Sequence, residues 1–64
     1  MNTRQADRLI KSNQTAKFQT KIGDTFSGKV VKRDRYSLYI VYTLDGKNER
    51  TGIFSRDDTE VVTE

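Results

Sequence analysis

Cationic and aromatic side chains gather in one short stretch of the 64-residue chain, between residues 23 and 40. Its cations and the aromatic residue that follows them are Lys29, Lys32, Arg33, Arg35 and Tyr36. Ammonium and guanidinium groups attract phosphates, and an aromatic ring offers a surface on which a base can stack. The stretch is typical of a strand that binds nucleic acid, and a plain solvated strand face is the alternative interpretation.

Two residue types that many enzyme sites use are missing from this sequence. It has no histidine and no cysteine, which removes imidazole acid–base catalysis, thiolate nucleophiles, disulfides and the usual zinc ligands. It also lacks a phosphate-binding glycine loop and a carboxylate pair set in apolar sequence. Asp57, Asp58 and Glu60 are three nearby acids that could suggest a metal site. The sequence offers no further metal ligands beside them, so we interpret them as a solvated acidic end. We expect no enzyme activity, no cofactor and no metal.

Charge is unevenly distributed along the chain. There are 12 lysines and arginines against 9 acids, a net charge of +3. Cations outnumber acids between Lys11 and Arg35. From Asp57 onward, all the charged residues are acids. Such polarity gives one surface a positive potential that favours a polyanion. We expect single-stranded RNA as the partner.

The length of the chain limits its core. A single domain this small is marginally stable without a disulfide or a metal, so we expect a homo-oligomer. No apolar run approaches the ~20 residues of a membrane span. Arg4, Asp7 and Arg8 interrupt any signal-peptide pattern at the start. We expect a cytoplasmic protein with no membrane association.

The apolar spacing predicts one helix followed by strands. Residues 2–12 should be helical, with Asn2 as the cap and Gln5 as its return partner. From residue 16 the apolar period becomes two, which indicates strands with one wet face. The predicted strands cover residues 16–22, 25–33, 35–44, 47–54 and 59–62. Gly23-Asp24 should form one turn, and Asp45-Gly46 a two-residue type I′ hairpin turn.

The predicted fold class is mostly β, with a short N-terminal helix and five antiparallel strands. Short strands joined by tight turns must curl to bury a core, which gives a strongly bent small barrel of Sm-like or SH3-like type. We expect a single domain over residues 1–64, with the helix at 2–12 and the barrel at 16–62. An oligonucleotide-binding (OB-type) barrel is the alternative architecture.

With this order of elements, two motifs resemble the Sm-like family, and within it the Hfq type of bacterial RNA chaperone. The first motif is matched by Gly23, Gly28, Val30, Asp34 and Tyr36, with Leu38 and Ile40 continuing the strand. The second corresponds without a gap to residues 53–62. Two positions depart from the pattern. Ser55-Arg56 replaces a Lys-His pair, and Asp58 replaces an apolar residue.

The resemblance implies a homo-oligomeric ring, built by strand pairing between subunits, that binds RNA near its pore. Tyr36 would stack a base there, and Arg35 would meet a phosphate or a base edge. Phe54 and Arg56 would lie close to the same pore, and Asp34 would brace a turn. Asp58 should face solvent, with the last strand carried by residues 61–62.

Two other functions remain open at this point. One is a protein–protein adaptor or inhibitor, encoded by a phage or plasmid, whose open strand edges add to the sheet of a protein partner. The other is a DNA-binding barrel of SH3-like or OB type. For Tyr36 and Phe54 a core or interface position is the alternative to base stacking.

Overall fold

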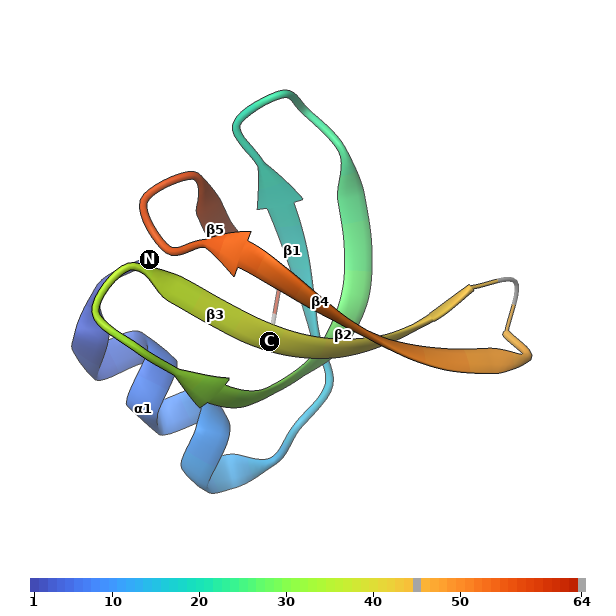
Figure 1. The fold of residues 1–64 in the computed structure, drawn as a ribbon, viewed down its shortest axis with the longest axis horizontal. Helices are drawn as coiled ribbons and strands as arrows, with labels where there is room; N and C mark the ends of the chain where they lie inside the picture. The colour runs from blue at the N-terminus through green and yellow to red at the C-terminus, as the bar shows by residue number, and fades with distance from the viewer. Residues whose placement is uncertain (45, 64) are drawn as a thin grey trace.

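One helix precedes five strands in the computed structural model, which describes residues 1–44 and 46–63. The elements are α1 (Thr3–Ser12), β1 (Ala16–Thr20), β2 (Thr25–Arg33), β3 (Ser37–Leu44), β4 (Asn48–Ser55) and β5 (Thr59–Thr63). The strands form one antiparallel sheet in the order β4-β3-β2-β1-β5, so that β4 and β5 are its edges (Figure 1). This confirms the mostly-β prediction with a short N-terminal helix.

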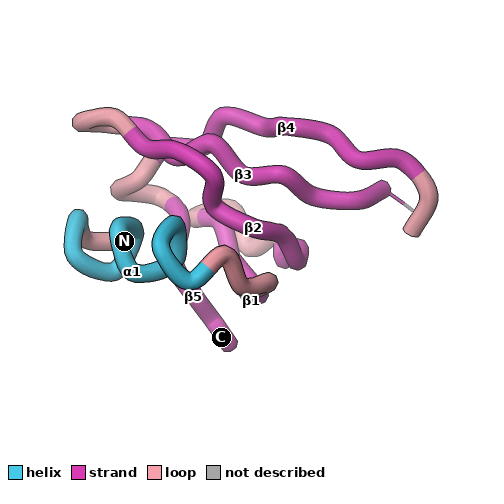
Figure 2. The backbone as a smooth tube through the Cα atoms, turned by 90° about the horizontal axis from the view of Figure 1, so that it is seen from below, coloured by secondary structure: helices cyan, strands magenta, loops and turns pink. Residues whose placement is uncertain are grey.

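Asparagine residues cap both ends of the helix. The side chain of Asn2 accepts a hydrogen bond from the main-chain nitrogen of Gln5 at 2.8 Å, as predicted. Asn13 ends the helix in the left-handed conformation, with φ 54°, and its N–H donates to the carbonyl of Leu9. Figure 2 shows α1 lying along one side of the sheet. Its position covers the buried face of the strands.

The core is a small apolar cluster between α1 and the concave side of the sheet. It consists of Met1, Ala6, Leu9, Ala16, Phe18, Val30, Leu38 and Ile40. The rings of Phe18 and Phe26 stack with 5.5 Å between their centroids, which extends the cluster toward β4. Burial of these side chains is the main stabilising contribution, because each buried methylene is worth about 0.8 kcal/mol.

Two glycines shape the first half of the sheet. Gly23 has φ 98° in the turn between β1 and β2, which a residue with a side chain rarely adopts. Gly28 lies where β2 approaches β3 most closely. A Cβ atom there would be 2.5 Å from the carbonyl oxygen of Val41 and 2.8 Å from Cγ2 of Ile40. A bulge between Val30 and residue 32 then shifts the register, which adds twist to the strand.

Several details differ from the sequence prediction, and the first strand ends at Thr20 rather than at residue 22. The third strand begins at Ser37 rather than at residue 35, because the intervening residues form a turn. The pairing of Leu44 with Asn48 leaves three residues between β3 and β4, so the expected two-residue turn was wrong in length, and Asp45 itself lies outside the described residues. In β5 only Val61 packs on the core, whereas Val62 is 52% exposed.

Gly28→Ala should lower the free energy of unfolding by about 1–3 kcal/mol, because the added methyl group meets a main-chain carbonyl that cannot move aside. Urea denaturation measures this change. The control is Ser27→Ala at the exposed neighbouring position, which should change stability by less than about 0.5 kcal/mol. Equal unfolding midpoints for Gly28→Ala and the parent protein would contradict the close approach of β2 and β3.

Candidate nucleic-acid interface

The turn between β2 and β3 is held together by one carboxylate. Oδ1 of Asp34 accepts hydrogen bonds from the main-chain nitrogens of Tyr36 at 2.9 Å and Ser37 at 2.7 Å. The nitrogen of Asp34 donates to the carbonyl of Ser37 at 3.0 Å. These bonds fix the backbone and present Arg35 and Tyr36 to solvent, with Tyr36 70% exposed. Asp34 therefore braces a turn, as expected.

The same bonds set the charge of the turn. Hydrogen bonds from the main-chain N–H groups of Tyr36 and Ser37 hold the pKa of Asp34 below its ordinary value of 3.8, and the hydroxyl of Tyr39 and the charge of Lys32 act in the same direction. Partial desolvation opposes this shift without reversing it. The carboxylate is therefore ionised at neutral pH, and the turn keeps its acceptor.

The turn between β4 and β5 adjoins this one, although the two are far apart in the sequence. The nitrogen of Arg56 donates to the carbonyl of Tyr36 at 2.8 Å. Nη1 of Arg56 donates to Oγ1 of Thr3 at 2.9 Å, and its own carbonyl accepts from the α-amino group of Met1 at 2.8 Å. Nε of Arg56 is buried without a hydrogen-bond partner among the described residues. The structure thus brings Arg35, Tyr36 and Arg56 together.

Arg33, also expected to contact nucleic acid, is engaged within the fold. Its Nε donates to Oδ1 of Asp7 at 2.6 Å, and its Nη2 donates to Oδ2 at 3.1 Å. The hydrogen bonds raise the pKa of Arg33 and lower the pKa of Asp7. This two-pronged contact ties α1 to the end of β2. Arg33 therefore positions the helix through Asp7.

Lys29 and Lys32 lie on the exposed surface of β2, and Lys32 is close enough to the Asp34 turn for its charge to act on that carboxylate. They pair across the sheet with Val41 and Tyr39, respectively. Nζ of Lys32 lies 5.5 Å from the centre of the Tyr39 ring, within range of a cation–π interaction. These two lysines form a cationic surface on the sheet, next to the Asp34 turn.

Phe54 belongs to the packing of the sheet. Its ring is half-buried and stacks on Phe26 with 4.7 Å between the centroids, and Tyr42 meets it edge-on at 6.1 Å. Gly52 makes room for this cluster, because a Cβ atom there would lie 2.7 Å from the Phe54 ring and 2.9 Å from the Tyr42 ring. The ring of Phe54 is therefore occupied by aromatic neighbours.

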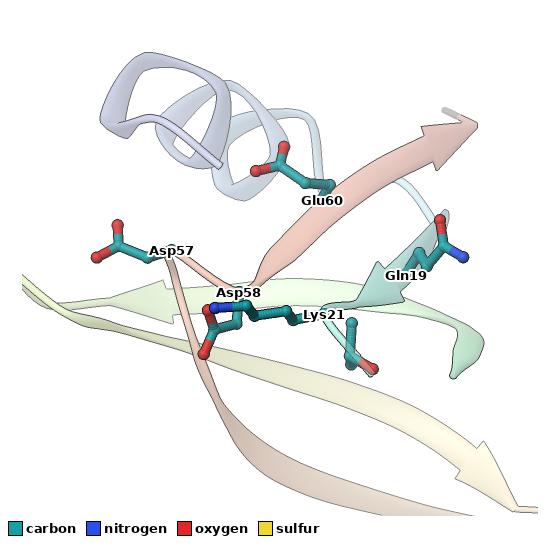
Figure 3. Close-up of a pocket in the computed structure, with 6 residues that line it drawn as sticks. Gln19, Lys21, Asp57, Asp58 and Glu60 are labelled. Atoms are coloured by element: carbon teal, nitrogen blue, oxygen red, sulfur yellow. The ribbon is translucent and has the colours of Figure 1, made fainter. Parts of the chain in front are cut away.

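A hollow with acidic walls lies between the end of β1 and the β4–β5 turn (Figure 3). It is lined by Gln19, Thr20, Lys21, Asp57, Asp58 and Glu60. The three carboxylates diverge in Figure 3, and Glu60 accepts a hydrogen bond from the α-amino group of Met1 at 2.7 Å. No group of acidic side chains among the described residues is arranged to hold a metal ion. Asp58 is exposed, as expected.

Large apolar side chains at the sheet edges were not singled out from the sequence. Ile53 on β4 is 67% exposed and Val62 on β5 is 52% exposed. Ile22, in the turn after β1, is 85% exposed. The alternation within β4 could have predicted that Ile53 is exposed, because Gly52 and Phe54 lie on the opposite face of the strand. Each edge strand thus carries one large exposed apolar side chain.

Comparison with known proteins identifies no relative of this chain. No family model, curated protein or solved structure matches the chain. No helix in the described part of the chain is long and apolar enough to cross a membrane. The two adjoining turns, with an exposed aromatic ring and two arginines, are the best-defined candidate site.

Replacement of Asp34 should expose the energetic role of the turn. Its pKa is lowered in the folded protein, so its stabilising contribution is present above its ordinary pKa and is lost as the pH falls through the folded value. Asp34→Ala should therefore be less stable than the parent at pH 7, and this difference should shrink as the pH falls below about 4. Urea denaturation across this pH range measures both effects.

The control is Asp57→Ala, which removes the same charge from an exposed side chain. It should cost less stability at neutral pH, because Asp57 accepts no hydrogen bond among the described residues. Equal stabilities of the two variants at neutral pH would show that the bonds of Asp34 do not stabilise the turn.

Proposed function

We propose that this protein binds single-stranded RNA at the Tyr36 turn and acts as an Sm-like, Hfq-type RNA chaperone in a homo-oligomeric ring. The observation that carries the proposal is the exposed ring of Tyr36, fixed by the Asp34 turn beside Arg35 and Arg56. A base stacks on the ring, and the guanidinium groups meet phosphates or base edges. Binding proceeds by electrostatic capture followed by stacking.

The rigid turn makes stacking more favourable. A ring that is 70% exposed contributes little to the core, so the fold alone does not account for Tyr36. Because the backbone of the turn is already fixed by three hydrogen bonds, RNA does not have to order it. Less conformational entropy is lost on binding, and more of the stacking energy appears as affinity.

The edges of the sheet support self-association. Free strand edges with exposed apolar residues are unfavourable in water, and β4 and β5 expose Ile53 and Val62. Pairing β4 of one copy with β5 of the next is a head-to-tail contact, which closes into a ring when the rotation permits. The ring repeats the Tyr36 turn in every subunit and holds several RNA segments close together. Closure of the sheet into a small barrel belongs to the same proposal.

The open edges also favour a second candidate function, the protein adaptor. An extended segment of a partner protein can add to β4 or β5 as a further strand. Such binding involves neither Tyr36 nor its neighbouring arginines. The two functions therefore separate in an RNA titration, and a parallel titration with DNA of the same sequence tests for a DNA-binding barrel.

Tyr36→Leu should weaken binding of single-stranded RNA by about 1–3 kcal/mol, because the stacking surface is lost. The fold should keep its stability, since the side chain is exposed. Fluorescence anisotropy at several salt concentrations measures the affinity. Tyr36→Phe is the matched control, because it keeps the ring and should bind nearly as well as the parent. Loss of folding or assembly in Tyr36→Leu, with unchanged affinity per folded subunit, would place Tyr36 in an interface.

Ile53→Lys should dissociate the oligomer, because it places a charge in the apolar contact between the edge strands. Sedimentation or native mass spectrometry measures the number of subunits. The control is Val31→Lys, which adds the same charge at an exposed position of β2, an inner strand of the sheet. A parent protein that is already monomeric would remove the ring from the proposed function.

A further inference from the structure

The α-amino group of Met1 is enclosed by oxygen atoms of the β4–β5 turn and of β5. It donates hydrogen bonds to the main-chain carbonyls of Arg56 at 2.8 Å and Thr59 at 3.0 Å, and to Oε1 of Glu60 at 2.7 Å. An ammonium group has three N–H donors, so the three acceptors match it in number. We call this nitrogen and the three oxygen atoms around it the Met1 site.

The Met1 site lies at the border of the core. Met1 is only 6% exposed, and its side chain belongs to the same apolar cluster as Ala6 and Leu9. Thr59, which supplies one of the carbonyls, is also buried. A cation removed from water is stable only where its donors have partners, and a buried oxygen atom is costly without a donor. The ammonium group and its acceptors therefore depend on each other.

The Met1 site connects segments that are far apart in the sequence. The three hydrogen bonds join residues that are 55, 58 and 59 positions apart. Arg56 extends the connection, because its main-chain nitrogen donates to the carbonyl of Tyr36 and its Nη1 donates to Thr3. In Figure 1 the start of the chain, marked N, lies beside the turn between β4 and β5. The α-amino group thus helps to hold this turn against the start of α1.

An acyl group on the α-nitrogen is incompatible with this arrangement. Formylation or acetylation converts the ammonium group into a neutral amide, which keeps one of the three N–H donors. The acyl carbon is bonded at about 1.33 Å from the nitrogen. It would have to enter a space whose three oxygen atoms lie only 2.7–3.0 Å from that nitrogen. An acylated chain would lose the charge and two donors, and it would also introduce a steric clash.

We propose that Met1 is a modification site that controls folding, because the native fold is complete only when the α-nitrogen carries no acyl group. Removal of such a group is a hydrolysis. Water adds to the acyl carbon, the amide C–N bond breaks, the acyl group leaves as formate or acetate, and the freed amine takes up a proton. Because the nitrogen is buried in the folded chain, an amide hydrolase must act before folding is complete. This inference goes beyond the proposed function, since it rests on the Met1 site alone.

The test compares two forms of the same sequence, one with a free α-amino group and one that retains a formyl group. Cell-free synthesis with and without an inhibitor of deformylation yields the two forms, and their intact masses identify them. The thermal midpoint of the formylated form should be lower by about 10 °C or more, because buried hydrogen bonds are lost.

Two charge variants determine whether the effect arises at the Met1 site. Glu60→Gln and Asp57→Asn each remove one negative charge from an exposed side chain, but only Glu60 bonds the α-nitrogen. With a free amino group, Glu60→Gln should lower the midpoint less than formylation does, because both carbonyl acceptors remain. Formylation should also have a smaller effect in Glu60→Gln than in the parent, whereas Asp57→Asn should not change its effect.

A measurement on the unmodified protein tests the same site even where the formylated form does not fold. Acetic anhydride in limiting amount should acylate the α-amino group on the order of 100-fold more slowly in the folded protein than in urea, because reaction requires local opening. The exposed amine of Lys21 should react at similar rates in both conditions. Peptide mapping by mass spectrometry measures the two positions separately.

The outcomes either support the inference or overturn it. A destabilised or unfolded formylated form, together with slow acylation of Met1 in the folded protein, supports it. Equal thermal midpoints for the two forms, or equal acylation rates in folded and unfolded protein, overturn it. A mature chain that retains an acyl group, lacks Met1 or carries residues before it, and is as stable as the free form, also overturns it. RNA affinity of the free form decides the proposed function separately.

Discussion

The main chains of β2 and β3 approach so closely at Gly28 that the carbonyl of Val41 occupies the space of a side chain. This contact allows one sheet to bend over a single short helix, which is how a chain of 64 residues encloses a core without disulfides. The pairing of Ser37 with Ser55 at the end of the β3–β4 ladder then places the β4–β5 turn beside the β2–β3 turn. The candidate site exists because these two turns meet.

Charged residues that are close neighbours in the sequence have different structural roles. Arg33 and Arg35 are separated by one residue, yet Arg33 holds the helix through Asp7 while Arg35 faces solvent. Asp34, between them, accepts the main-chain hydrogen bonds of the turn. One short segment thus contains both residues that hold the fold together and a cation that faces solvent. Whether a charged side chain of this segment stabilises the fold or faces solvent depends on whether another helix or strand supplies a group that it can bond.

The periodic parts of the fold could be predicted from the sequence, and the long-range contacts could not. Alternation gave β2 at its observed bounds, and Asn2 marked the start of α1. The pairing of Arg33 with Asp7 and the aromatic cluster of Phe54 depend on tertiary proximity, for which local spacing contains no signal. Tyr36 was singled out by the resemblance to the Sm-like family, whereas the local pattern placed it in a strand from residue 35 and missed the turn that Asp34 braces.

Gly52 has a consequence for how tolerance to mutation would be interpreted. Its missing side chain leaves room for the rings of Phe54 and Tyr42, so any larger residue displaces part of the aromatic cluster. In a saturation mutagenesis experiment scored by activity, Gly28 and Gly52 would therefore appear as intolerant as a ligand-contacting residue. Only the abundance of folded protein separates the two classes, because loss of packing reduces the amount of native protein and loss of a contact does not.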